Sequence, residues 1–494
     1  MTSSFVPPHT APAPAHAPWS PRMWGLLVVL AGNMLIDALE VSVALVALPT
    51  IGTDLGASLT TTQWTITGFA VGFGGLMLFG ARVVALLGRR RVYLAALLGF
   101  AVASLIGALA EDPSLLTATR VVKGFCAALT APTGLAIIAT TFPEGTPRNR
   151  ALSVYTLFGA GGFTTGLLLS GWLTGFSWRL TFAFPAPAVL VLFVLGLRLI
   201  PGSTQGGAER PGGGTAQPPS GAARRRYGFA SAVAFLVALL ALVQGITSVP
   251  AHGWVDLRST GLLVLTGVLL SLFVALERAS AEPLVRFAAL RSGAMIRSAL
   301  GATCLNGSYL GLLFIAGHQL QSLAGWSPLR TAAAFLPAAA PLVVAAPYSG
   351  RIVARFGAPR LIAAGALLPF AGYLLYLRTP WPLAYATGIL PTMLLVGAGF
   401  VLSFAALNSQ ATSQLPPVER GAASGLYQTG VQVGATLSVA LVAALLTAWT
   451  PPAGAVPAEI AAACRPALTV VTAIGGLGLL TALTGLRFRR MGPH

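Results

Sequence analysis

The chain has 494 residues, of which 55% are hydrophobic and only 9% are charged. Soluble domains carry about a quarter charged residues, so this composition excludes an ordinary soluble protein and indicates a membrane protein. The formal net charge is +18, but the basic residues are spread between apolar runs rather than gathered on one face. We therefore expect no nucleic-acid partner.

Residues 1–22 form a Pro- and Ala-rich segment with almost no charge before Arg22. We expect a disordered leader without a signal-peptide cleavage site. Long apolar runs follow, and a bilayer span needs about 20 mostly apolar residues. They predict an all-α integral membrane protein with fourteen transmembrane helices, near 24–50, 62–86, 92–110, 114–142, 150–174, 178–200, 228–249, 259–277, 293–320, 329–354, 359–378, 382–408, 419–448 and 466–487.

One long polar gap, 201–227, is rich in Gly, Pro and Ser and is expected to be a flexible cytoplasmic linker. An internal repeat also appears, because ARVVALLGRRR (81–91) follows the second run and GRIVARFGAPR (350–360) follows the tenth. An offset of eight runs fits two six-helix halves with an extra helix pair between them. The expected divisions are a leader (1–22), an N-terminal bundle (23–200), the linker, two inserted helices (228–278) and a C-terminal bundle (279–490).

Basic residues predict the orientation, because positively charged loops stay on the cytoplasmic side. With a cytoplasmic N-terminus, Arg120 and Lys123 fall within a span, and most of the other basic residues fall at inner ends. The outer exceptions are Arg179, Arg258, Arg330, Arg378 and Arg465. Both termini are therefore expected to be cytoplasmic.

Several segments together resemble the fourteen-helix drug:proton antiporter branch of the major facilitator superfamily, over about 24–487. LEVSVALVALPTIGTDLGAS (39–58) resembles the end of its first helix, and GARVVALLGRRRVYL (80–94) resembles its basic loop signature. RVVKG (120–124) resembles the Arg-x-x-Gln-Gly signature of helix four. GFTTGLLLSG (162–171) and ERGAASGLYQTGVQVG (419–434) resemble helices five and thirteen.

The chain departs from the family pattern at several positions. Glu40 stands where the first-helix acid is usually Asp, and Lys123 replaces the helix-four Gln. Ala85, and Ala354 in the second copy, replace the Asp that helps to latch the two halves together. In helix five Leu167 replaces the expected Pro, and Ser170 replaces one Gly. The resemblance thus implies an antiporter scaffold without implying its usual gating.

Charged side chains within the predicted spans are the strongest candidates for function. Asn33, Asp37 and Glu40 form one stripe of the first helix, because their spacing returns to the same helical face. Thr117, Arg120 and Lys123, the only lysine of the chain, form a stripe of the fourth helix. Counted from the helix ends at 1.5 Å per residue, Glu40 and Lys123 both lie roughly 13 Å below the outer boundary. Opposite charges at equal depth predict facing partners.

The resemblance implies that helices one and four line a central cavity, so we expect Asp37, Glu40, Arg120 and Lys123 to form a proton-coupling network there. Intramembrane ionisable residues are functional by default. The alternative is a static salt bridge that braces helix one against helix four.

Other candidates follow from the polar side chains of the spans and from the repeated loop. Candidate substrate-cavity residues are Asn33, Trp64, Asn306, Tyr309, His318, Gln321 and Gln432. For the four on helix nine, Asn306, Tyr309, His318 and Gln321, a structural role is the alternative. Candidate gating-loop residues are Gly88, Arg89, Arg90, Gly350 and Gly357. No metal cluster, phosphate loop or hydrolase triad is evident, so we expect no cofactor, no metal and no catalytic residue.

The predicted function is proton-coupled export of a small amphipathic organic molecule, a drug or a self-made metabolite, by alternating access. The Ala, Gly, Pro and Arg bias is typical of a high-GC bacterium, so the expected location is the cytoplasmic membrane, with a monomer in the lipid bilayer. Two alternatives remain open. One is a facilitator-fold protein repurposed as an enzyme or ligand sensor, and the other is an uptake carrier for an anionic metabolite.

Overall fold

The computed structural model describes residues 19–202, 221–280, 283, 292–380, 382–413, 420–449 and 455–490, and that part of the chain is helical. The N-terminal half contains α1 (Pro21–Asp54), α2 (Leu59–Thr62), α3 (Trp64–Leu87), α4 (Arg89–Ala108), α5 (Pro113–Thr141), α6 (Thr146–Thr174), α7 (Trp178–Ala183) and α8 (Pro185–Leu199).

Two helices, α9 (Gly221–His252) and α10 (Leu257–Ala279), precede the C-terminal half. That half contains α11 (Gly293–His318), the π-helix η2 (Gln319–Leu323), α12 (Pro328–Ala345), the 3₁₀ turn η3 (Ala346–Tyr348), α13 (Ser349–Phe356), α14 (Ala358–Leu377), the π-helix η4 (Tyr385–Ile389), α15 (Leu390–Ser413), α16 (Arg420–Ala448), α17 (Pro457–Ala463) and α18 (Arg465–Arg490).

The helices agree in position with the predicted spans. Among the described residues, 13 helical segments are long and apolar enough to cross a membrane. The second predicted span corresponds to α3, whose 24 residues extend about 36 Å at 1.5 Å per residue. The architecture is therefore a multi-pass helical membrane protein, and it is consistent with the fourteen spans expected.

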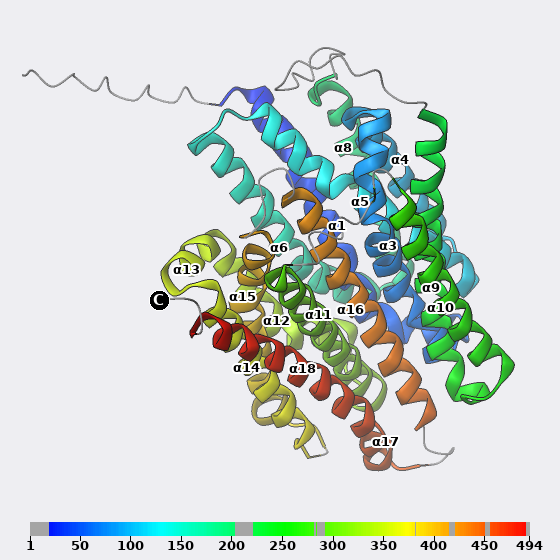
Figure 1. Cartoon of the computed structure of the whole chain (residues 1–494). Helices are drawn as coiled ribbons and strands as arrows, with labels where there is room; N and C mark the ends of the chain where they lie inside the picture. The colour runs from blue at the N-terminus through cyan, green and yellow to red at the C-terminus, as the bar shows by residue number, and fades with distance from the viewer. Residues whose placement is uncertain are drawn as a thin grey trace, which may run out of the picture.

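Two bundles and an additional helix pair make up the molecule. In Figure 1 the blue and cyan helices of the N-terminal half lie above the yellow and red helices of the C-terminal half, and green α9 and α10 lie along the right edge. The halves meet where α3 packs against α16 and α6 packs against α12. The inserted α9 packs against both α3 and α16, so it lies beside the contact between the halves.

Two predicted boundaries need correction. The expected linker ended at 227, but α9 begins at Gly221, so 221–227 belong to a helix. The expected leader ended at 22, but α1 begins at Pro21. The Ser20 hydroxyl caps this helix by accepting a hydrogen bond from the Met23 amide at 3.3 Å. The remainder of the predicted leader and linker, 1–18 and 203–220, lies outside the described residues.

Two predicted spans are divided into shorter helices. The sixth becomes α7 and α8, with Pro185 at the start of α8. The tenth becomes α12, η3 and α13; Pro347 lies in η3, where the α-helix is interrupted, and Pro337 and Pro341 lie within α12. Proline lacks the amide hydrogen that continues a helix, which accounts for these interruptions.

The internal repeat has the same backbone conformation in both halves. Gly88 has φ 83° and ψ 144°, and Gly357 has φ 79° and ψ 138°. The amide of Gly88 donates to Val84 O at 3.0 Å, and that of Gly357 donates to Val353 O at 2.9 Å. A positive φ is readily adopted only by glycine. Both glycines therefore reverse the chain between a span and the next one.

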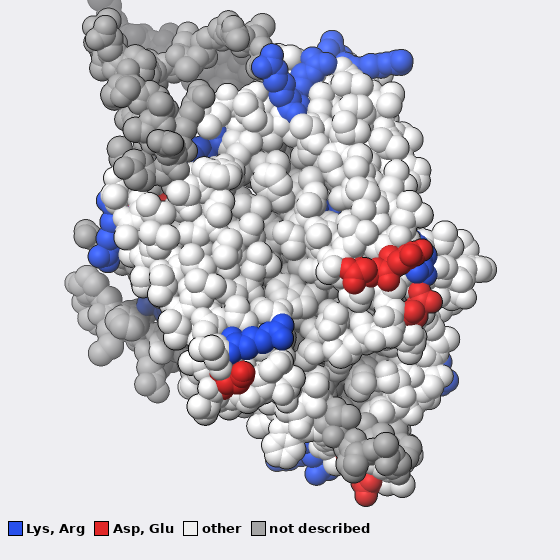
Figure 2. Space-filling view, turned by 90° about the vertical axis from the view of Figure 1, so that its right-hand side faces the viewer, with Lys and Arg blue, Asp and Glu red and all other residues white. Residues whose placement is uncertain are grey.

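Uncharged side chains cover most of one flank, where Lys, Arg, Asp and Glu gather in a few clusters (Figure 2). On α10, Val264 and Val268 remain 60% and 58% exposed. Large apolar side chains left in contact with water would be unfavourable, so this flank fits contact with lipid.

Close packing fixes α5 against its neighbours. A Cβ atom at Gly124 of α5 would collide with the carbonyl oxygen of Phe69 in α3, and one at Gly72 would collide with the backbone of Val121. Small residues let helix backbones approach in this way.

At the start of α5 the Ser114 hydroxyl donates to Asp112 and holds the pKa of that carboxyl below its usual range. Asp112 also caps the helix by accepting from the Leu115 amide.

Candidate functional site

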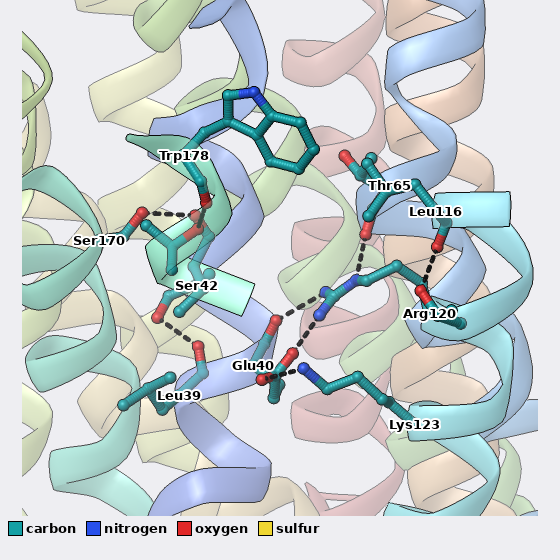
Figure 3. Close-up of polar contacts among 12 residues, drawn as sticks. Leu39, Glu40, Ser42, Thr65, Leu116, Arg120, Lys123, Ser170 and Trp178 are labelled. Carbon is teal, nitrogen blue, oxygen red and sulfur yellow. Dashed lines mark hydrogen bonds and ion pairs between the residues drawn. The ribbon is translucent and has the colours of Figure 1, made fainter. Parts of the chain in front are cut away.

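An ion cluster around Glu40 lies between α1 and α5. Lys123 Nζ is 2.5 Å from Glu40 Oε1, and Arg120 Nη1 donates to Oε2 of the same carboxylate. Arg120 Nη2 donates to the backbone oxygen of Glu40 at 2.8 Å. Figure 3 shows Glu40 pointing from α1 toward the two cations of α5. The exposed fractions are 0%, 0% and 1% for Glu40, Arg120 and Lys123, so the cluster excludes water.

Aromatic rings and a backbone carbonyl enclose the two cations. Arg120 Nε donates to Thr65 O of α3 at 2.6 Å. Its guanidinium carbon lies 4.9 Å from the ring centre of Phe69, and Lys123 Nζ lies 4.8 Å from that of Phe100 in α4. Phe182 of α7 lies within 5.8 Å of both charged groups. Ring faces attract cations, so this shell partly replaces the lost hydration.

The predicted pairing of Glu40 with Lys123 is present, but its surroundings differ from those expected. The partners of the cluster come from α1, α3, α4, α5 and α7, all within the N-terminal half. In this conformation the cluster is therefore enclosed inside one bundle instead of lining a central cavity. Its role in proton coupling stays a prediction.

Asp37 is separated from this cluster, although the sequence predicted a single network of four charges. Its Oδ2 accepts hydrogen bonds from Asn33 Nδ2 at 2.9 Å and from Thr130 Oγ1 at 2.8 Å. Its Oδ1 is buried and has no hydrogen-bond partner among the described residues. Asn33 is therefore a hydrogen-bond donor to Asp37 in this conformation, and its contact with a substrate stays a prediction. The two acids of α1 have different chemical environments one turn apart.

Aromatic side chains connect the two halves beside this region. Tyr309 of α11 lies between Phe163 of α6, at 5.8 Å, and Phe400 of α15, at 4.9 Å between ring centres. Phe404 stacks on Phe400 at 5.1 Å with planes 13° apart. Of these rings, only Tyr309 was predicted from the sequence as a substrate-cavity residue. The spacing of Phe400 and Phe404 by four residues was the signal for the stacked pair.

Three other substrate candidates make contacts that hold helices together. Asn306 Nδ2 donates to Val431 O of α16 at 3.0 Å, within the C-terminal half. Gln321 Nε2 donates to Val46 O of α1 at 3.1 Å, between the halves. Gln432 of α16 is buried against α3, with its Cβ 2.6 Å from where a Cβ of Gly74 would lie.

The two remaining candidates make no ring contact with Tyr309 in the described part of the chain. Trp64 packs beside Val71, Leu239 and Ala440, from α3, α9 and α16. His318 is partly buried at the end of α11. The structure therefore does not gather the predicted substrate residues into one site. Tyr309 alone lies among the rings between the halves.

The candidate gating residues contact their own half. Arg89 Nη1 donates to Thr140 Oγ1 of α5 at 3.3 Å, and Arg90 Nη2 donates to Leu197 O of α8 at 2.6 Å. Gly350 lies in α13, where an added Cβ would meet no atom within 4 Å. Ala85 and Ala354, at the latch positions, are both exposed. These contacts anchor the basic loop to its own bundle, and its gating role stays a prediction.

Known proteins are similar to this chain in sequence. The family model of the Major Facilitator Superfamily matches residues 30–439. The puromycin resistance protein pur8 of Streptomyces alboniger is 35% identical over 87% of this chain and 82% of its own length. The cephamycin export protein CmcT of Amycolatopsis lactamdurans is 33% identical over 85% and 84%.

A solved structure has the same fold at low sequence identity. The bacterial homologue of the human lysosomal transporter Spinster, in an inward-facing and occupied conformation, aligns with a TM-score of 0.63. It is 16% identical, over 95% of this chain and 98% of its own. The family match, the two relatives and the shared fold together show that this chain is a membrane transporter belonging to the Major Facilitator Superfamily.

Proposed function

We propose that this protein exports a small amphipathic organic molecule across a bacterial cytoplasmic membrane in exchange for protons, as a monomer. The single observation that carries the proton coupling is the buried cluster in which Arg120 and Lys123 bind Glu40. Ionisable groups inside a membrane are costly, and buried ion pairs are seldom favourable enough to persist for stability alone. The two relatives reported above are named for resistance or export, which supports the outward direction.

The rings between the halves are the proposed contact surface for the substrate. Phe163, Phe400 and Phe404 are partly buried, and they lie where α6 of one half approaches α11 and α15 of the other. Aromatic surfaces bind flat or amphipathic molecules over a large area without requiring specific hydrogen bonds. Alternating access would expose this surface to each side of the membrane in turn.

The alternative functions are less well supported. Uptake of an anionic metabolite requires a free positive charge, but both Arg120 and Lys123 bind Glu40 and are enclosed. An enzymatic role has less support, because the family and the relatives are transporters.

A transport assay tests the proposal. The full chain is reconstituted in liposomes, and uptake of radiolabelled puromycin is measured with and without an imposed pH gradient. Puromycin is the first probe because a relative is named for resistance to it. We expect accumulation that requires the gradient and is abolished by a protonophore. Accumulation that ignores the gradient would contradict proton coupling, and equal rates in empty liposomes would contradict transport of this probe.

The proposed orientation places both termini in the cytoplasm, and cysteine labelling tests it. Single cysteines are introduced at Ser220, in the predicted linker, and at Gly253, between α9 and α10. A membrane-impermeant reagent applied to whole cells should label position 253 and miss position 220. The unsubstituted protein is the control, because Cys126 and Cys464 are buried and Cys304 is partly buried. Labelling in the reverse pattern would invert the orientation.

A further inference from the structure

Glu40 and Asp37 differ in whether a cation binds the carboxyl group. Both oxygens of the Glu40 carboxylate and its backbone carbonyl accept from Arg120 or Lys123. A proton on Glu40 would leave two enclosed cations without a counter-ion, and an unpaired buried charge is strongly unfavourable. Both cations of the cluster therefore depend on the Glu40 carboxylate as their counter-ion.

Asp37 has no cation among its hydrogen-bond partners. Its Oδ2 accepts from the neutral amide of Asn33 and the neutral hydroxyl of Thr130, and its Oδ1 is buried without a partner in the described part of the chain. Asp37 itself is only 2% exposed. An ionised carboxylate in this environment costs far more than a neutral carboxyl. The Oδ1 atom, which accepts no hydrogen bond from a described residue, is thus where a proton would reside.

Other titratable groups surround Asp37 from each neighbouring helix. Cys126 of α5, Tyr93 of α4 and Tyr155 of α6 each interact electrostatically with its carboxyl. The Tyr93 hydroxyl is itself buried and has no hydrogen-bond partner within the described ranges, while Tyr155 donates to Ala131 O at 2.9 Å. These neighbours are neutral at physiological pH, so they supply no counter-charge. Glu40, one turn along α1, adds repulsion to any negative charge on Asp37.

We infer that Asp37, rather than Glu40 at the family's usual acid position, carries the coupling proton; this inference rests on the proposed proton-coupled export. In the conformation described here Asp37 is a neutral acid with its proton on Oδ1. When the halves rearrange and admit water, the O–H bond breaks and the proton passes to that water. The carboxylate left behind is hydrated by the water that has entered, and it still accepts from Asn33 and Thr130. Glu40, Arg120 and Lys123 hold α1 against α5, which carries Thr130, and so act as positioning residues for Asp37.

Infrared difference spectroscopy on the full chain in lipid nanodiscs tests the assignment without any substrate. Raising the pH should remove the carbonyl stretch of a protonated carboxyl from the spectrum. In Asp37→Asn this signal should be lost. It should persist in the double variant Glu40→Gln with Lys123→Gln, which keeps the net charge of the cluster and so avoids stranding a second cation. Glu144→Gln, at an exposed side chain that is 87% accessible, is the control.

Transport of puromycin in liposomes is the second measurement. We expect Asp37→Asn to lose gradient-driven accumulation while it keeps exchange of labelled for unlabelled puromycin, because Asn imitates the neutral acid. A protonated-carboxyl signal that survives in Asp37→Asn, or that disappears in the Glu40→Gln double variant, overturns the inference. So does gradient-driven accumulation by Asp37→Asn. If the wild type does not transport puromycin at all, the proposed export of that probe fails, while the infrared result still decides which acid holds the proton.

Discussion

Single residues decide how this protein tolerates charge in its interior. Two cations share one carboxylate, and each makes a second favourable contact, Arg120 with Thr65 O and Lys123 with the ring of Phe100. Removal of one partner from such a cluster leaves an uncompensated charge in a medium of low dielectric constant. Lys123, where the family resemblance implies Gln, therefore changes the charge balance of the whole site.

The first prediction concerns the stability of this cluster. Glu40→Gln alone should lower the free energy of unfolding by about 3–5 kcal/mol, because Arg120 and Lys123 then repel each other without a counter-ion. The double change with Lys123→Gln should recover most of that loss. Thermal unfolding in detergent measures both effects. If the double variant also regains full gradient-driven transport, the cluster is only a brace between α1 and α5.

A second prediction at this scale concerns the substrate surface. Phe400→Ala removes the ring that lies between Tyr309 and Phe404, so it should weaken substrate binding. We expect a higher KM for puromycin with an unchanged dependence on the pH gradient, measured by initial uptake rates in liposomes. Leu394→Ala, at an exposed position of the same helix, is the matched control. An unaltered KM in Phe400→Ala would place the substrate elsewhere.

At the scale of elements, the turns between spans depend on backbone conformation more than on side chains. Gly88 between α3 and α4 and Gly357 between α13 and α14 have nearly the same positive φ. Other residues rarely adopt this conformation, because their Cβ atom clashes with the backbone. The sequence repeat thus encodes the same chain reversal twice, at equivalent places in the two bundles.

The third prediction follows from this conformation. Gly88→Ala and Gly357→Ala should each lower the free energy of unfolding by about 1–3 kcal/mol, the usual cost of a strained backbone position. Gly350→Ala is the matched control, because it lies within α13 and an added Cβ there meets no atom within 4 Å. Thermal unfolding of the three variants compares them directly. Equal stability of all three would show that the positive φ values are not needed.

At the scale of the whole molecule, the halves are joined without the aspartates that the family resemblance implies. Gln321 of η2 donates to Val46 O of α1, and Thr429 of α16 donates to Gly74 O of α3 at 3.3 Å. At the repeated loops, Ala85 and Ala354 are exposed and cannot form an ion pair. In this conformation the halves are joined by helix packing and by these hydrogen bonds to backbone oxygens.

The fourth prediction restores a charge at this place. Ala85→Asp puts a carboxylate near the basic loops, and it should shift the equilibrium toward the state in which these loops lie together. Spin labels at Leu87 and Phe356, which are 59% and 51% exposed, report the distance between the loops. Ala85→Asn, with the same shape and no charge, is the control. An identical distance distribution in the Asp and Asn variants would mean that gating does not use this position.

The amino-acid sequence alone predicts where the spans and the repeat lie and that this is a membrane protein, because bilayer thickness sets the length of apolar runs and local backbone sterics set the glycine turns. It also placed Asn33, Asp37 and Glu40 on one face of α1, since that follows from helical periodicity. The three-dimensional packing sets which acid meets the cations, encloses the cluster within one bundle, and brings Phe163 and Phe400 to Tyr309. These contacts depend on the axial offset and the separation of helices that are distant in sequence, and close packing such as that of Gly124 against Phe69 sets both.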